Sequence, residues 1–514
     1  MNQNVEGGSC QWQYASLLSE KLMMKTKNTF LLLLAWSVIV LLLLSIDSPL
    51  HEVYGHNDSA WFFMCGKAVM NGLTPYVDFT DSKGPLLWLI YGIGYLISPR
   101  NYVGVWVLTC LCYAGTLFYN YKTARLLLAD DRKALLVALL MPLAYFLPWF
   151  HYEVRAEDFC FLPVAVTIYY LFHLLYNKEG ESYSIRHYGL VLGGCFMALV
   201  LIKYSLAVMQ ASMIIVALWY WMWERSEYGA PLKWLLCGMA AVALPFVIWL
   251  TAVGAFPAFV DEYFINTFHT VTTEKGFMAT LSEEMTNSWS AINSQALLLI
   301  IALGGWLLSR LLPCYRYVPL VISLFFYLVC TRHNMNYYYS ACYSFLLFLF
   351  IYLISQLRKP VRTWNYVLAA AVVLVWSISE NVRSTSPKQM TTKWATTSYR
   401  DSYNRIARAI DGEKPLMMNL CAGEFGFGMA AKALPAGKYW SKQVGMTPEM
   451  LKGHKDLLKS GRADYVIALD DVSCYRDGLT PQYIRSLGYE VCDSLVYVDY
   501  KRHQRTTLVY RKKK

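Results

Sequence analysis

The sequence predicts an all-α polytopic membrane protein with a small α/β domain at its C-terminal end. The chain of 514 residues is 56% hydrophobic and 16% charged, and its mean hydropathy of +0.32 is typical of membrane proteins. It also contains 17 Trp and 39 Tyr, the residue types that favour the membrane–water interface. The long apolar runs stop near residue 380, and the remaining segment alternates between helix and strand patterns.

The first apolar run, residues 29–46, follows Lys25 and Lys27. A cleaved signal peptide would also begin with lysines and an apolar stretch. This run is long, however, and no small-x-small cleavage site follows it. We therefore expect a cytoplasmic N-terminal segment over residues 1–28 and a first span that is retained.

Eleven apolar runs of spanning length predict a transmembrane domain over residues 29–380. One further run, "PLLWLIYGIGYLI" at 85–97, has only about 13 residues, which suits a juxtamembrane or re-entrant helix better than a span. The eleven runs are 29–46, 103–120, 134–150, 159–176, 188–203, 206–223, 234–252, 295–309, 317–331, 337–356 and 364–380.

The distribution of basic residues predicts the orientation of these spans. If 85–97 does not cross, the cytoplasmic segments hold 16 Lys and Arg and the outer segments hold seven. The positive-inside rule favours this arrangement, which also accounts for the net charge of +11 without a nucleic-acid partner. It places residues 381–514 outside the cytoplasm, and we expect an integral protein of a bacterial inner membrane.

Residues 381–514 are expected to form a small extracytoplasmic α/β domain. In this domain, Gly423–Gly428 ("GEFGFG") lacks the spacing of a dinucleotide fingerprint, and we expect a tight turn and no nucleotide cofactor. The expected helices are 399–411, 447–461 and 480–488, and the expected strands are 415–420, 463–470, 489–500 and 506–512.

Three outer segments, far apart in the sequence, combine carboxylates with cations where the chain leaves the membrane. Ionisable residues at such positions are costly and usually mark a functional site. Cations suit an anionic group such as a phosphate, and carboxylates suit a base or a divalent metal ion. Simpler structural roles also exist for such residues: Asp58 could be a helix N-cap, Lys83 a lysine that extends to the interface, and "EVRAED" an interfacial ion-pair cluster. The candidates are Asp58, Asp81 and Lys83 in the first segment, Arg155, Glu157 and Asp158 in "EVRAED", and Arg332 and His333 in "TRHNMNYYY".

The first of these segments resembles the first outer loop of the GT-C membrane glycosyltransferases. The resemblance is to the protein-mannosyltransferase and aminoarabinose-transferase branch (glycosyltransferase family 39-like). Asp58 takes the position of an acidic residue that opens a juxtamembrane helix, and Lys83-Gly84-Pro85-Leu86 resembles the Lys-Pro-Pro-Leu-like turn of that branch. "VRAEDF", "NMNYYYSACYSFLL" and a C-terminal extracytoplasmic α/β domain also resemble it. Two positions depart from the pattern: Ser59 follows Asp58 in place of a second acidic residue, and Gly84 replaces the first proline.

The resemblance implies an inverting glycosyltransferase that moves a sugar from a polyprenyl-phosphate carrier to an acceptor hydroxyl on the outer face. Asp58 would take the proton of the acceptor hydroxyl. Lys83 and Arg155, together with Arg332, would hold the phosphate leaving group. Glu157 and Asp158 would orient Arg155, bind a divalent metal ion or contact sugar hydroxyls, and Asp81 and His333 would complete the binding site. The helix over 85–97, with Trp88, would border the groove for the lipid tail.

Two other classes of function stay open at this point. A transporter or flippase for a lipid-linked glycan would need ionisable residues near the middle of the membrane, where Lys203 is the candidate. A non-catalytic assembly subunit would leave Asp58 and Lys83 without a chemical role. The acceptor (glycan, lipid or protein) and the sugar, hexose or pentose, stay open as well.

Overall fold

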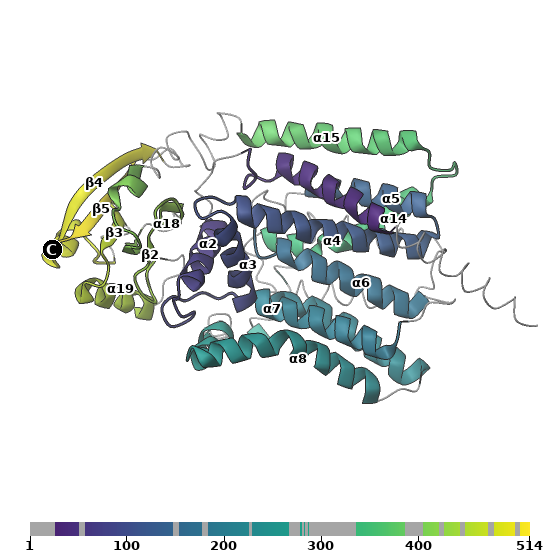
Figure 1. Ribbon diagram of the computed structural model, residues 1–514, viewed down its shortest axis with the longest axis horizontal. Coiled ribbons are helices and arrows are strands. Elements are labelled where there is room, and N and C mark those ends of the chain that lie inside the picture. Colours follow the sequence, from purple (N-terminus) through teal and green to yellow (C-terminus); the bar gives the residue numbers. More distant parts are fainter. Residues whose placement is uncertain are drawn as a thin grey trace, which may run out of the picture.

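Figure 1 shows a computed structural model of the protein, in which a helical bundle carries a small sheet domain at one end. The structure describes residues 26–50, 57–146, 154–176, 183–225, 229–266, 278–279, 282, 286, 336–385, 405–420, 426–442, 448–470, 477–498 and 504–513.

The bundle is built from apolar helices, and six helices of the described residues are long and apolar enough to cross a membrane. Local sequence signals fix several of their ends. Asp130 caps α5 by accepting hydrogen bonds from the backbone N–H groups of Arg132 (2.8 Å) and Lys133 (3.1 Å). The helices of the bundle are Thr26–Leu44, α4 (Val103–Leu128), α5 (Asp131–Leu140) with η1 (Met141–Phe146), η2 (Asp158–Cys160) with α6 (Phe161–Tyr176), α7 (Ile185–Glu224), α8 (Gly229–Ala252), η6 (Asn336–Leu346) with α14 (Leu347–Ser355), and α15 (Thr363–Thr385).

Helix α7 consists of two antiparallel arms that reverse direction at Lys203. The backbone of Lys203 is extended (φ −158°, ψ 102°) between two helical stretches. The rings of Tyr188 and Trp221 lie 6.1 Å apart, and Gln210 Nε2 donates to the Leu192 carbonyl at 3.5 Å. In one straight helix, residues 33 positions apart would be separated by roughly 50 Å. The reversal therefore makes residues 185–202 and 204–224 two crossings, as the runs 188–203 and 206–223 predict.

The predicted spans agree with the helices that the structure describes. Runs 295–309 and 317–331 lie outside the described residues, and the other runs fall on helical segments. In two of these segments, α5 with η1 and η6 with α14, part of the described stretch is a 3-10 helix and not an α-helix. The run at 85–97 forms the isolated helix α3 (Pro85–Ile97), which has the predicted bounds and is too short to be counted among the spanning helices.

The C-terminal domain contains a five-stranded mixed sheet with the order β2-β1-β3-β5-β4. Strand β1 pairs in parallel with β2 and β3, whereas β5 pairs antiparallel with β3 and β4. Both α19 (Pro448–Ser460) and α21 (Pro481–Ser486) fall on predicted helices, and α18 (Gly426–Ala430) is an additional short one. The strands are β1 (Leu416–Asn419), β2 (Leu434–Pro435), β3 (Tyr465–Leu469), β4 (Tyr489–Val498) and β5 (Gln504–Lys512).

The sheet buries both of its faces, one of them toward the membrane bundle. Met417 and Ile467 belong to the same apolar core as the bundle helices. Their neighbours Met418 and Val466 belong to a second core that includes Leu458 of α19. Because successive side chains of a strand point to opposite faces, this division shows that the sheet lies between the bundle and its own helices.

The two ends of the bundle differ, because the C-terminal domain lies at one end only (Figure 1). At the end away from the sheet, the basic loops around 130 and 360 meet: Lys133 Nζ donates to the Leu357 carbonyl at 2.9 Å, and Arg132 to the Val361 carbonyl at 3.4 Å. At the other end, α2 (Asn57–Met70) and α3 lie between the bundle and the C-terminal domain. Segments 121–133 and 357–363, two of those predicted to be cytoplasmic, therefore lie together at one end of the bundle, opposite the sheet.

Candidate functional site

Helix α2 places Asp58 at the end of the bundle that faces the C-terminal domain. Asp58 lies in the first turn of α2, where a negative charge is favoured by the helix dipole, and it is partly exposed. It is close enough to Asp81 for the two negative charges to repel, which contributes to the raised pKa of Asp81. Phe62 lies one helical turn after Asp58, and the Lys83 ammonium sits 5.5 Å from the centre of its ring. Asp58 and Lys83 therefore approach the same face of α2.

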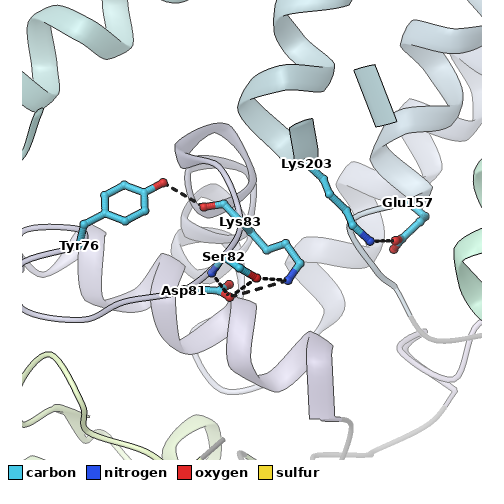
Figure 2. A network of polar contacts seen from close by, with 6 residues as sticks. All are labelled: Tyr76, Asp81, Ser82, Lys83, Glu157 and Lys203. Atoms are coloured by element: carbon cyan, nitrogen blue, oxygen red, sulfur yellow. Dashed lines mark hydrogen bonds and ion pairs between the residues drawn. The ribbon is translucent and has the colours of Figure 1, made fainter. Parts of the chain in front are cut away.

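The loop before α3 holds the Lys83 side chain through its immediate neighbours (Figure 2). Lys83 Nζ donates to Ser82 Oγ at 3.0 Å and lies 3.8 Å from Asp81 Oδ1. The Tyr76 hydroxyl donates to the Lys83 carbonyl at 2.9 Å. The side chain of Asp81 is only 8% exposed, and burial raises the pKa of its carboxyl above the usual value. The loop thus presents a partly exposed ammonium, 20% accessible, on a fixed backbone.

A direct backbone contact brings Lys83 to the reversal of α7, so that Figure 2 shows Lys83 and Lys203 in one network of polar residues. Gly84 N–H donates to the Ile202 carbonyl at 3.0 Å. A Cβ atom at position 84 would lie 2.0 Å from the Leu201 carbonyl oxygen, so only glycine permits this approach. The replacement of the expected proline by Gly84 is thereby explained, because proline has no N–H to donate.

We expect Gly84→Ala to displace the Lys83 loop from α7 and to weaken binding of an anionic ligand at Lys83. The added methyl group meets backbone atoms of Leu201, which cannot move aside as a flexible side chain could. The matched control is Gly194→Ala, because a Cβ at Gly194 comes no closer than 3.7 Å to Val242. Thermal unfolding and lipid-phosphate binding should change for Gly84→Ala and stay at parent values for Gly194→Ala. Equal behaviour of the two variants would contradict this account of Gly84.

The segment "VRAEDF" contributes a buried carboxylate that pairs with Lys203. Glu157 is 2% exposed, and its Oε1 lies 2.6 Å from Lys203 Nζ. Asp158 accepts a hydrogen bond from the backbone N–H of Arg155 through Oδ2 at 2.8 Å. Glu157 thus pairs with Lys203, and Asp158 holds the Arg155 backbone. Of the two carboxylates predicted to orient Arg155, Asp158 is hydrogen-bonded to its backbone N–H.

Val154 connects this segment to the first span and to both juxtamembrane helices. Its N–H donates to Asp47 Oδ2 at 2.6 Å, and its carbonyl accepts from the hydroxyls of Ser59 and Tyr91. Burial raises the pKa of Asp47 to about 7. These contacts fix the spacing between Asp58 on α2 and the segment that carries Arg155.

Trp88 does not border a groove, contrary to the prediction from the sequence. Its side chain is fully buried and packs against Tyr76 (ring centroids 4.5 Å apart) and Phe79 (5.1 Å). The indole therefore belongs to the core beneath the Lys83 loop. The exposed apolar surface of α3 lies toward its C-terminal half, at Ile93, Leu96 and Ile97, which are 39%, 62% and 53% exposed.

Two predicted site residues, Arg332 and His333, lie outside the described residues. No group of three or more His, Cys, Asp or Glu side chains capable of holding a metal ion occurs in the part of the chain that the structure describes. Lys203 pairs with Glu157, and the Arg155 N–H donates to Asp158, so both carboxylates predicted as metal ligands have protein partners. A divalent metal ion stays a prediction of the sequence.

The helical bundle and its polar residues define a class of protein: a polytopic membrane protein whose polar site lies where its spans meet an attached α/β domain. The chain has the GT-C fold of membrane glycosyltransferases, as shown by its likeness to ArnT from Cupriavidus metallidurans. The structure of ArnT bound to undecaprenyl phosphate matches with a TM-score of 0.58 at 11% sequence identity, over 93% of this chain and 97% of ArnT. ArnT in the apo state matches with a TM-score of 0.58 at 12% identity, over 96% and 98% of the two chains.

One family model matches in sequence. Residues 82–249 fit the family described as dolichyl-phosphate-mannose-protein mannosyltransferase, and this range begins at the Lys83 turn and includes Arg155, Glu157 and Lys203. No curated protein matches the chain in sequence. The predicted resemblance to the GT-C glycosyltransferases is thus confirmed.

Proposed function

We propose that the protein transfers a glycosyl group from a polyprenyl-phosphate carrier to the hydroxyl group of a glycan, lipid or protein acceptor. One observation carries the proposal: tertiary packing brings Lys83 and Lys203, from segments far apart in sequence, to the face of the bundle where Asp58 opens α2. The mannosyltransferase family match, which includes Lys83 and Lys203, and the fold shared with ArnT, which is bound to undecaprenyl phosphate in one structure, support this choice of donor.

In this proposal, Lys83 binds the phosphate of the donor and stabilises the negative charge that grows on it as the sugar leaves. Its ammonium is partly exposed and is held in place by Ser82 and Asp81. Lys203 adds positive charge at the neighbouring turn, and Glu157 fixes its position. Arg155 supplies a third cation from a segment whose backbone Asp158 and Asp47 hold. Prearranged cations of this kind lower the barrier because they need no reorganisation during the reaction.

Asp58 acts as the general base in this mechanism. Its carboxylate accepts the proton from the acceptor hydroxyl while the oxygen attacks the anomeric carbon, and the bond from that carbon to the phosphate oxygen breaks. The products are the glycosylated acceptor and the polyprenyl phosphate. One carboxylate suffices for a single displacement, which inverts the anomeric configuration.

The reaction products distinguish this function from transport or assembly. Purified protein is incubated with a short-chain polyprenyl-phosphate sugar and a mixture of candidate acceptors, and the lipids are identified by mass spectrometry. A transferase releases free polyprenyl phosphate only when an acceptor is present. A transporter or an assembly subunit leaves the lipid-linked sugar intact, and that result would refute the proposal.

The site and the C-terminal domain are proposed to face away from the cytoplasm of a bacterial inner membrane. The basic loops around 130 and 360 meet at the opposite end of the bundle, which supports this orientation through the positive-inside rule. An alkaline phosphatase fused after Lys514 should therefore be active in a bacterial host, and a fluorescent cytoplasmic reporter at the same point should be dark. The reverse pair of results would overturn the orientation.

A further inference from the structure

Glu262 connects the loop that carries Lys83 to the C-terminal domain. It lies in the π-helical turn η3 (Val260–Asn266), which follows α9 (Phe256–Phe259). Its Oε2 accepts a hydrogen bond from Thr80 Oγ1 at 3.1 Å, and its Oε1 pairs with Lys438 Nζ of the C-terminal domain. We call these two contacts the Glu262 bridge. Single π-helical turns often occur at functional sites.

The Glu262 bridge is more protected from water than the contact between Asp78 and Arg462, which also joins this loop to the C-terminal domain. Thr80 is 4% exposed, and the side chains of Glu262 and Lys438 are 14% and 32% exposed. A second contact between this loop and the C-terminal domain, Asp78 to Arg462 at 3.4 Å, is 26% and 52% exposed. Charge-assisted hydrogen bonds strengthen as water is excluded, whereas exposed ion pairs contribute little.

The C-terminal domain also contacts helix α2 directly. The indole rings of Trp61 and Trp440 stack with centroids 5.0 Å apart. The Lys67 ammonium donates to the carbonyls of Gly428 (3.1 Å) and Ala431 (2.7 Å), and burial lowers the pKa of Lys67 to about 7. The domain thus touches both elements that carry the candidate residues: α2 with Asp58, and the loop that leads to Lys83.

We propose that Glu262 is a positioning residue through which the C-terminal domain sets the place of the Lys83 loop. Thr80 lies three residues before Lys83, with Asp81 and Ser82, the two contacts of its ammonium, in between. Fixing Thr80 therefore restricts the whole stretch from 80 to 83. The inference that this restriction serves ligand binding rests on the proposed function of Lys83.

The test uses the full-length protein in detergent or nanodiscs, with Glu262→Ala and Lys438→Met as variants. Hydrogen–deuterium exchange reports the mobility of residues 78–84, and titration with a short-chain polyprenyl phosphate reports binding. Both variants should exchange several-fold faster in this stretch and bind the lipid phosphate roughly three- to tenfold more weakly, the size expected for one hydrogen-bonded contact. Arg462→Met is the matched control and should leave both readouts within error of the parent, because its ion pair is exposed.

A charge exchange separates a specific contact from a general loss of structure. The double variant Glu262→Lys with Lys438→Glu should restore slow exchange over 78–84, whereas each charge reversal alone should not. Parent-like exchange in both Glu262→Ala and Lys438→Met would overturn the inference. If the parent protein bound no lipid phosphate, the proposed function would fail, and the exchange rates would still decide whether Glu262 positions the loop.

Discussion

Purified Asp58→Asn protein is expected to lose glycosyl transfer by roughly a hundredfold or more, because asparagine cannot accept the proton of the acceptor hydroxyl. Asparagine keeps the size and the helix-capping ability of aspartate. Since Asp58 lies in the first turn of α2 and is partly exposed, the variant should stay folded and inserted. Its affinity for polyprenyl phosphate should fall little, because the cations provide that binding.

The matched control for this variant is Asp78→Asn, which removes a carboxylate from the same outer segment. Asp78 contacts Arg462 and the backbone N–H of Thr74, away from the Lys83 ammonium. Initial rates with a polyprenyl-phosphate sugar should therefore fall for Asp58→Asn and stay near the parent rate for Asp78→Asn. Near-normal turnover by Asp58→Asn would remove this residue as the base.

Replacement of Lys83 by methionine is expected to weaken binding of polyprenyl phosphate roughly ten- to a hundredfold. A hydrogen bond to a charged group contributes on the order of 1.5–3 kcal/mol, and about 1.4 kcal/mol corresponds to a factor of ten in affinity. Methionine keeps most of the length of the side chain but removes the ammonium, together with its contact with the Phe62 ring, so the loss reports the charge. Titration with a short-chain polyprenyl phosphate measures the effect.

Two further variants sharpen this prediction. Lys83→Arg keeps the positive charge and should bind better than Lys83→Met, because a point contact to phosphate depends more on charge than on shape. Arg155→Met should also weaken binding, since Arg155 is proposed to reach the same phosphate from a different segment. If Lys83→Met and Arg155→Met both bound the lipid as tightly as the parent, the phosphate site would lie elsewhere and the non-catalytic function would be favoured. Lys203→Met is a poorer probe, because it would leave the buried carboxylate of Glu157 without its 2.6 Å partner.

The sequence located most helices because the signals that define them are local. The run at 85–97 became α3 with the same bounds, since a proline at its start and the loss of apolar residues at its end are visible in the sequence. Four of the five strands of the C-terminal domain (β1, β3, β4 and β5) were predicted for the same reason, as short apolar stretches between turns, whereas β2 was not predicted. The orientation stays a prediction, because it rests on a count of charges.

The sequence did not show which residues pair with one another in the site, because these pairs depend on contacts between distant segments. From the sequence, Lys203 was a candidate only for a transporter's mid-membrane charge, and its ion pair with Glu157 spans 46 positions. Trp88 looked like an interfacial residue by type and is buried under the Lys83 loop. Glu262 lies in residues 253–293, an amphipathic and acidic segment by its sequence, and nothing local indicated that it would reach both Thr80 and Lys438.

The sequence by itself determined that this chain is a polytopic membrane protein, which charged residues cluster at the ends of its spans, and which family those residues resemble. Hydrophobicity and spacing carry that information because the bilayer imposes the same length and polarity on every span. Only the tertiary structure decided which charges meet. The close approach of Gly84 to the turn at Lys203 joins two segments more than a hundred residues apart, and the energy of such a contact depends on packing that no local pattern records.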